Sequence, residues 1–444
     1  MPSTPASTSS TRSSSRRTRA SCRTRRNASS VRRVKQLTHP DWVRRFNYLG
    51  DIAGSPRNVV SLEPDDLLAT ARADTRLHDV GESEWPGWEE TFRRLLTSID
   101  TESRLHLLGR VLTRGEVLRI LRTWLRLNEL WATTPAVAAE PVDAPLFVVG
   151  PPRTGTTILL ELLALDPQLR APLAWEALHP LRDLPDARRL ELAEVEQEFW
   201  ADIHPEFITM HELASDLPCE CVHFLSYDFA GPYWGMLYDT PSFTGWQLEH
   251  LETLGRVYRL HRRMLQTFQA GDTPRRWLLK SPYHIATLPA LFAEYPDALV
   301  IHTHRDPRKF VASLVSILST LRFMRSDAVD VAPLGPAMEL TYQMFLEGAI
   351  NQRTSGEIPG DRIVDSHFVD LMKDPVGTLQ RLYGELGLTW PKSHGEVVTA
   401  YLAAKPKAKH GEHKYSYAEV GLDEDHVRAT FATYVEHYGI AEEA

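Results

Sequence analysis

The hydrophobic positions of the chain follow two different periods. From about residue 36 to residue 140 the apolar residues recur at three- and four-residue spacings, as Val117, Leu118, Leu121 and Trp124 do, with arginines between them. This spacing is typical of amphipathic helices. We therefore predict a helical N-terminal region, residues 36–140, that packs on the core formed by the rest of the chain.

The second pattern begins after this region. Residues 146–149 are a short apolar run, followed by a glycine-containing loop and by the nearly all-apolar segment 158–165. Two later runs, 277–279 and 298–301, are also short and apolar. Short apolar runs that alternate with helical segments favour buried parallel strands. The sequence predicts an α/β domain over residues 141–444, with a parallel sheet flanked by helices.

Residues 1–35 fit neither pattern. They are rich in Ser, Thr and Arg, and they carry nine Arg and one Lys without any acidic residue. Such a segment cannot offset its ordering entropy by burying apolar surface, so we expect a disordered basic tail. The tail is either an electrostatic tether or targeting segment, or an extension without a function.

Charge and composition narrow the class of protein. The formal charge of −8 for the whole chain leaves −18 for the 409 residues after the tail. An acidic body is a poor candidate for broad nucleic-acid binding, which needs a basic face. With only three cysteines, a disulfide framework is excluded. The sequence also lacks a run of about 18 apolar residues, so we predict no integral membrane segment. We expect a soluble, cytoplasmic protein, and these patterns leave its oligomeric state open.

The loop after the first predicted strand carries the first candidate chemistry. Residues 150–157 read GPPRTGTT and stand directly before the apolar segment. Closely spaced backbone amides and a helix N-terminus can bind an anion. A nucleoside-triphosphate loop has a lysine after its second glycine, whereas Thr156 and Thr157 follow Gly155 here. The missing lysine, together with the lack of a clear magnesium-binding aspartate, argues against a Mg-nucleotide hydrolase and predicts no metal.

Residues 152–157 resemble the 5′-phosphosulfate-binding loop of sulfotransferases that use 3′-phosphoadenosine 5′-phosphosulfate (PAPS) as donor. In that family a later strand delivers an arginine, and a serine eight residues on joins it at the donor's 3′-phosphate. Arg305 and Ser313 have this spacing. The resemblance covers about residue 145 to the end of the chain. In the loop, it implies donor contacts from Arg153, Thr154, Gly155, Thr156 and Thr157.

Two later segments extend the resemblance on the donor side. Phe368 lies in a segment similar to the one whose aromatic residue contacts the donor adenine in the family. Lys409 and Gly411 lie in a segment that resembles the family's late loop at the 3′-phosphate. A Lys-rich loop is otherwise commonly a solvated surface.

The resemblance also implies catalytic residues. Lys280 stands in a segment similar to the one with the family's catalytic lysine, but Pro282 occupies the place of the histidine base of the phenol and steroid branch. The tyrosylprotein branch instead uses a glutamate shortly after the helix of the first loop, which favours Glu176 as the base. His211 and His284 are the alternatives. Arg153 and Lys280 would stabilise charge on the transferred sulfuryl group.

The acceptor side rests on residues 227–246, which are dense in aromatic residues. They predict either core packing or a pocket for an apolar or aromatic small molecule or a lipid. The sequence as a whole thus predicts a PAPS-dependent sulfotransferase that acts on a hydroxyl group. The alternatives are a P-loop kinase-like phosphotransferase and a non-catalytic nucleotide-binding protein.

Overall fold

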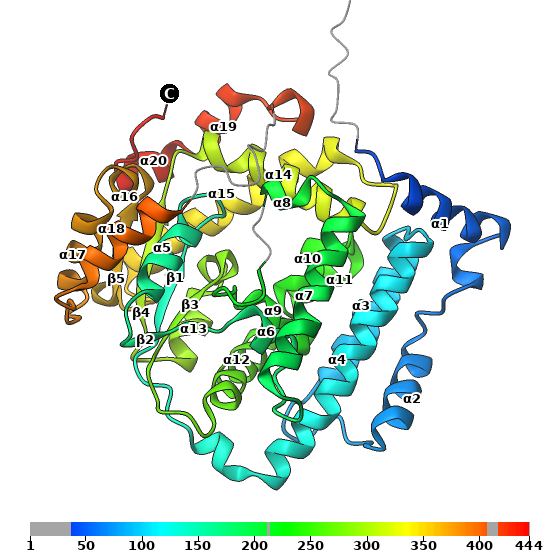
Figure 1. Ribbon diagram of the computed structural model, residues 1–444. Coiled ribbons are helices and arrows are strands. Elements are labelled where there is room, and N and C mark those ends of the chain that lie inside the picture. The colour runs from blue at the N-terminus through cyan, green and yellow to red at the C-terminus, as the bar shows by residue number, and fades with distance from the viewer. Residues whose placement is uncertain (1–36, 211–213, 406–415, 444) are drawn as a thin grey trace, which may run out of the picture.

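The structure is a computed structural model that describes residues 37–210, 214–405 and 416–443 (Figure 1). Within these residues five strands form a parallel sheet in the order β2-β3-β1-β4-β5. Their bounds are β1 Leu146–Val149, β2 Leu169–Arg170, β3 Arg276–Lys280, β4 Leu299–His304 and β5 Ile363–His367. The predicted α/β class with a parallel sheet is confirmed.

Helices make up most of the remaining described chain. In chain order the α-helices are α1 Asp41–Ile52, α2 Pro64–Thr75, α3 Trp88–Glu102, α4 Leu107–Thr133, α5 Thr156–Ala164, α6 Ala174–Leu178, α7 Asp186–Ile203, α8 Phe207–Met210, α9 Val222–Leu225, α10 Pro232–Leu237, α11 Pro241–Glu249, α12 Thr253–Gln269, α13 Leu288–Glu294, α14 Pro307–Phe323, α15 Val331–Ser355, α16 Phe368–Lys373, α17 Pro375–Glu385, α18 His394–Ala404, α19 Glu424–Thr430 and α20 Ala432–Tyr438. Short 3-10 helices are η1 Pro56–Asn58, η2 Pro135–Ala139, η3 Ser226–Asp228, η4 Pro282–Ala286, η5 Gly360–Arg362 and η6 Ala418–Val420. Among the described helices, none combines the length and the apolar composition needed to cross a bilayer.

The central strand β1 is buried on both faces. Its Phe147 pairs with Leu279 of β3 on one side and with Val300 of β4 on the other. Since these strands are parallel, their carboxyl ends meet at one edge of the sheet. This edge brings together the loop after β1, Lys280 at the end of β3 and Arg305 after β4.

Apolar clusters cover the two faces of the sheet. Leu146 and Val148 of β1 pack in one cluster with residues of α5, α17 and α18. Phe147 and Val149 point to the other face and join a larger cluster with residues of α12, α13, α14 and α15. Helices on both faces are what a buried parallel sheet needs, because each strand presents apolar side chains to both sides.

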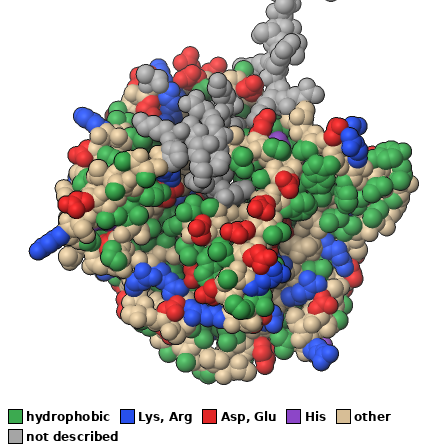
Figure 2. Space-filling model, viewed as in Figure 1, with side chains coloured by type: hydrophobic (Ala, Val, Ile, Leu, Met, Phe, Trp, Pro, Cys, Tyr) green, Lys and Arg blue, Asp and Glu red, His purple; other side chains and the backbone are tan. Residues whose placement is uncertain are grey.

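The N-terminal helices α1 to α4 form the right-hand side of the view in Figure 1. Their apolar residues belong to the same cluster as the second face of the sheet. The rings of Trp88 and Trp124 stack with centroids 4.9 Å apart, and Phe229 contacts Trp88 at 5.3 Å. Other hydrophobic side chains of this region are exposed, and Figure 2 shows them gathered on the surface over α1. The division into two regions at residue 140 stays a prediction.

Candidate active site

The loop after β1 has a backbone that requires its glycines. Gly150, Arg153 and Gly155 all have positive φ angles, of 137°, 70° and 89°. A Cβ on Gly150 would lie 2.4 Å from the Thr303 hydroxyl oxygen, so no side chain fits there. The Thr154 hydroxyl contacts Thr303 at 2.6 Å and donates to the Pro151 carbonyl at 2.7 Å. These bonds hold the loop against β4.

Lys280 is the cation at the end of β3. It is 2% exposed, and its Nζ donates to the Thr157 hydroxyl at 3.2 Å. Its second partner is the carboxylate of Glu220, whose side chain is 20% exposed. The N–H of Cys221 donates to the Lys280 carbonyl at 2.8 Å and so fixes the Glu220 segment beside β3. Glu220 therefore lies beside the lysine, and nothing in the sequence pattern had singled it out.

Glu176 has a different environment. One carboxylate oxygen accepts a bond from Arg170 at 2.9 Å, and the other accepts the Leu173 N–H at 3.0 Å. Glu176 lines a small pocket together with Arg170 and Asp272. It is not among the described residues that line the cavity at Lys280. Its contacts explain a role in holding the start of α6, with the side chain buried.

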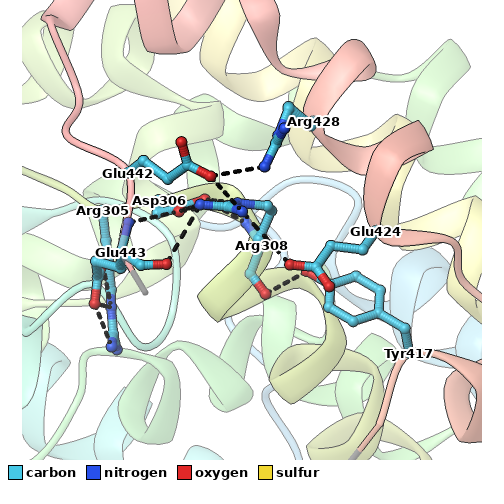
Figure 3. Close-up of polar contacts among 8 residues, drawn as sticks. All are labelled: Arg305, Asp306, Arg308, Tyr417, Glu424, Arg428, Glu442 and Glu443. Carbon is cyan, nitrogen blue, oxygen red and sulfur yellow. Dashed lines mark hydrogen bonds and ion pairs between the residues drawn. The ribbon is translucent and has the colours of Figure 1, made fainter.

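Arg305 gathers the residues predicted for the donor. Its Nη1 donates to the Arg153 carbonyl at 2.8 Å, and its guanidinium carbon lies 3.9 Å from the centre of the Phe368 ring. The Glu443 carboxylate accepts bonds from Arg305 Nε and Nη2, each at 2.9 Å (Figure 3). Ser313 follows within α14. Its hydroxyl is buried and has no hydrogen-bond partner among the described residues.

A second ion-pair cluster supports this arginine (Figure 3). Arg308 Nε contacts both carboxylate oxygens of Asp306, at 3.1 and 3.0 Å, and Arg308 Nη1 pairs with Glu442 at 2.9 Å. Although partial burial raises it, the hydrogen bonds from Arg308 hold the pKa of Asp306 below its usual value. The N–H of Glu443 donates to Asp306 at 3.0 Å. Hydrogen bonds and ion pairs therefore hold residues 442 and 443 against the start of α14.

Of the remaining candidates, only His284 is a residue that the structure describes. His211, Lys409 and Gly411 lie outside the described residues. His284 is fully buried in the core, where its Nδ1 contacts the Tyr258 hydroxyl at 2.8 Å and burial lowers its pKa to about 3. The absence of a metal stays a prediction. The described chain does hold groups of metal-ligand type, such as the buried His302 and His304 with the half-buried Asp365, but His304 and Asp365 already hydrogen-bond to each other at 2.8 Å.

A cavity of about 1330 Å³ opens at the same edge of the sheet. One end is polar and is lined by Arg153, Gly155, Thr156, Thr157, Glu220, Lys280, Arg305 and Phe368. The rest presents more apolar than polar surface and includes Trp200, Met210, Tyr233, Leu237, Leu314, Leu318, Leu321, Met338 and Phe345, together with charged residues such as Glu116, Arg119, Glu196 and Arg322. All five aromatic residues Tyr227, Phe229, Tyr233, Trp234 and Tyr238 belong to the core cluster, and of these Tyr233 and Tyr238 also line the cavity.

The chain is similar to known proteins over this fold and this site. Over 302 residues it is 26% identical to the omega-hydroxy-beta-dihydromenaquinone-9 sulfotransferase Stf3 of Mycobacterium bovis, a match that spans 64% of this chain and 73% of that protein. The crystal structure of the sulfotransferase STF1 from Mycobacterium tuberculosis H37Rv superposes with a TM-score of 0.70 and 28% identity, covering 83% of this chain and 98% of that one. STF9 from Mycobacterium avium has the same fold, with a TM-score of 0.75 at 24% identity over 86% of this chain and 97% of that one.

The match to a protein family is broader than any of the site motifs. It runs from residue 145 to residue 392 and so covers more than half of the 444 residues. This range begins at β1 and contains the loop, Glu220, Lys280, Arg305 and Phe368. With the parallel sheet, the loop and the cations at its carboxyl edge, the chain belongs to the sulfotransferase family.

Proposed function

We propose that the protein transfers a sulfuryl group from PAPS to a hydroxyl group of an apolar small-molecule or lipid acceptor. The observation that carries this proposal is the cavity itself. Arg153, Lys280 and Arg305 converge at its polar end, and a mostly apolar volume continues from them. An anionic donor and an apolar acceptor would meet where these two parts join.

The polar end fits the donor in three respects. The guanidinium of Arg305, which lines the cavity, suits the 3′-phosphate. Ser313 is not among the lining residues, but its buried hydroxyl lacks a partner within the described chain, a cost that a phosphate contact would remove. Phe368 lines the same end, with the Arg305 guanidinium over its ring, and would contact the adenine there. The loop amides and Arg153 suit the 5′-phosphosulfate. These residues are the ones that we propose bind PAPS.

The reaction needs a base that takes up a proton and a group that stabilises the leaving phosphate. The hydroxyl oxygen of the acceptor molecule forms a bond to sulfur, and the bond between sulfur and the 5′-phosphate oxygen breaks. The proton of that hydroxyl passes to the base. Lys280 would stabilise the negative charge that develops on the leaving oxygen. An ammonium group has three donors, so Lys280 can contact the phosphate without giving up Glu220.

For the base we propose Glu220 ahead of Glu176. Glu220 lines the cavity and contacts Lys280, so its carboxylate lies next to the point of transfer. Glu176 is held by Arg170 and by the Leu173 N–H outside the cavity. The Glu176 hypothesis and the His211 hypothesis remain as alternatives that the variants below distinguish.

The acceptor class follows from the lining of the cavity. Its lining presents more apolar than polar surface, and α8, α10, α14 and α15 each contribute apolar side chains to it. The relative Stf3 is named for a hydroxylated dihydromenaquinone, which is a lipid. An apolar acceptor that carries a single hydroxyl near Lys280 would match the cavity in both shape and polarity.

The test is transfer of radiolabel from donor to acceptor. Purified protein is incubated with ³⁵S-labelled PAPS and a lipid extract, and with γ-³²P ATP in a parallel reaction. We expect ³⁵S in an organic-extractable product that is heavier than its precursor by about 80 Da, and no transfer of ³²P; the Lys280→Ala variant is the control. Transfer of ³²P would favour the kinase-like alternative. Binding of adenosine 3′,5′-bisphosphate without turnover on any extract would favour the non-catalytic alternative.

A further inference from the structure

The helix α1 presents large apolar side chains to solvent. Trp42 is 38% exposed, Tyr48 60%, Leu49 48% and Ile52 63%. Spacings of seven and three residues place Trp42, Leu49 and Ile52 on one face of the helix, whereas Val43 on the opposite side is buried. These side chains lie in the region where Figure 2 shows the hydrophobic surface over α1.

The exposed face continues onto a neighbouring helix. The ring of Trp42 stacks on Phe199 of α7 with centroids 6.2 Å apart, and its Nε1 donates to the Asp202 carbonyl at 3.3 Å. Phe199 and Val195 are themselves exposed. We call the residues Trp42, Tyr48, Leu49, Ile52, Val195 and Phe199 the α1 patch. A contiguous exposed apolar surface of this kind marks an interaction site in a folded protein.

We propose that the α1 patch docks on the surface of an anionic lipid bilayer. Within α1, Arg44 and Arg45 are balanced by Asp41 and Asp51. The excess positive charge comes from residues 1–35, with nine Arg and one Lys and no acid, six residues before the helix begins. A helix with Trp, Tyr and aliphatic residues on one face next to a polybasic segment has the composition of an interfacial anchor.

The combination of features selects the partner. A nucleic acid would use the ten cations but not the apolar face, and a protein groove would use the apolar face but not the cations. An anionic bilayer uses both, because its headgroups attract the cations and its acyl region accepts the apolar side chains. Since the described helices include none that could span a bilayer, this contact is a surface contact.

The α1 patch lies near residues that line the cavity. His39, two residues before α1, stacks on Phe323 at 4.0 Å and contacts Asp327 at 2.9 Å, and the neighbouring residues Ser326 and Ala328 line the cavity. Trp200, next to Phe199, lines it too. A bilayer against the α1 patch would therefore present a membrane-dissolved acceptor close to the cavity. This role of the docking rests on the proposed function, whereas the docking itself does not.

The test is co-sedimentation of the full chain with vesicles. The vesicles are phosphatidylcholine alone or with about 30% phosphatidylserine, a fraction that gives a strongly negative surface. We expect binding to the anionic vesicles that weakens with salt. In Leu49→Ser/Ile52→Ser the partition coefficient should fall about ten- to hundredfold, because about half of each aliphatic side chain is exposed and would be buried in the interface. The matched control, Leu184→Ser/Val397→Ser, removes two exposed aliphatic residues elsewhere and should stay within about twofold.

A second variant tests the charge in the full chain. Arg16→Gln, Arg17→Gln, Arg25→Gln and Arg26→Gln together should reduce binding to anionic vesicles and its salt dependence. Equal binding of the patch variant and its control would overturn the proposal. So would binding of duplex DNA without vesicle binding, or a dimer that the patch variant converts to monomer without vesicle binding. Sulfuryl transfer to an acceptor in detergent is measured separately, so that failure of docking and failure of the proposed function are distinguished.

Discussion

Two of the cations at the polar end of the cavity, Lys280 and Arg305, each contact a carboxylate from a distant part of the chain. Glu220 is 60 residues from Lys280, and Glu443 is 138 residues from Arg305. Neither pairing has a local sequence signature, because nothing in the spacing indicates which acidic residue the fold brings to a cation. The cations themselves were predictable from the resemblance of their flanking motifs. The carboxylates required the structure.

Arg305 provides the most direct test of the donor site. Arg305→Ala should weaken binding of adenosine 3′,5′-bisphosphate by about 1.5 to 3 kcal/mol, the range for a charged hydrogen bond. Isothermal titration calorimetry measures this loss. Adenosine 5′-phosphate, which lacks the 3′-phosphate, is the control ligand and should lose little. Equal weakening of the two ligands would make Arg305 a structural residue.

The Glu443 carboxylate accepts hydrogen bonds from the guanidinium of Arg305, the group that we propose binds the 3′-phosphate. Glu443→Gln removes the competing charge, and since a partly exposed ion pair is worth up to about 1 kcal/mol, bisphosphate affinity should rise about two- to fivefold. Glu442→Gln is the matched control because Glu442 pairs with Arg308 and Arg428 instead. A loss of affinity in Glu443→Gln, or the same gain in both variants, would contradict the competition.

The Glu220→Gln variant tests whether Glu220 is the base, because the amide cannot take up the proton. Glu220→Gln should lower kcat by about 10² to 10⁴ while bisphosphate affinity changes little, as expected for loss of a general base. Steady-state kinetics and calorimetry on the same preparation separate the two effects.

The controls for this prediction are Glu176→Gln and His211→Ala. Glu176→Gln should lower the melting temperature, because the carboxylate pairs with the buried Arg170. Near-normal turnover in Glu220→Gln, with a collapse of kcat in either control variant, would move the base to that residue.

At the scale of elements, the sequence predicted a helix or strand correctly where the hydrophobic pattern of that one segment was enough to identify it. The run before Gly150, the loop and the apolar α5 were predicted in order, because strand, glycine turn and buried helix each have their own period. The strand β2 is only two residues long and was not predicted, since it exists through its pairing with β3. The aromatic stretch 227–246 could not be divided from sequence, because burial in the core and burial in a cavity select the same residues.

The loop after β1 gives a prediction at this scale. Gly150→Ala puts a methyl group against Thr303 at a φ of 137°, so the loop must shift away from β4. We expect a loss of about 1 to 3 kcal/mol in unfolding free energy and weaker binding of the bisphosphate. Chemical denaturation measures the first and calorimetry the second. Gly115→Ala, in α4 with open space around it, is the control and should be neutral or stabilising. Equal effects of the two substitutions would show that the loop does not depend on Gly150.

Across the whole molecule, buried histidines make stability depend on pH. Burial lowers the pKa of His284 to about 3 and that of His304 to about 4. In the unfolded chain a histidine titrates near about 6.5. Below that pH the unfolded state takes up protons that the folded state does not, so stability is full above pH 6.5 and falls as the pH drops toward 4. Each such histidine contributes about 1.4 kcal/mol per pH unit in this window.

Urea unfolding between about pH 7.5 and 5 measures this slope. His284→Asn removes one proton-binding group from the unfolded state and should reduce the slope by about one proton. The exposed His78 offers the control, His78→Asn, which should leave it unchanged. A stability that rises on acidification, or the same slope in wild type and His284→Asn, would show that these histidines do not govern the pH response.

The contact between the N-terminal tryptophans and Phe229 has a consequence for synthesis on the ribosome. Trp88 and Phe92 of α3 pack on Phe229, at ring distances of 5.3 and 5.0 Å, and Trp88 Nε1 donates to the Tyr227 carbonyl. At about 5 to 20 residues per second, the roughly 100 residues between the end of α4 and this partner take about 5 to 20 s to translate. During that interval the helices present an aromatic face with nothing to cover it. We therefore expect a nascent chain of this length to expose apolar surface that chaperones recognise.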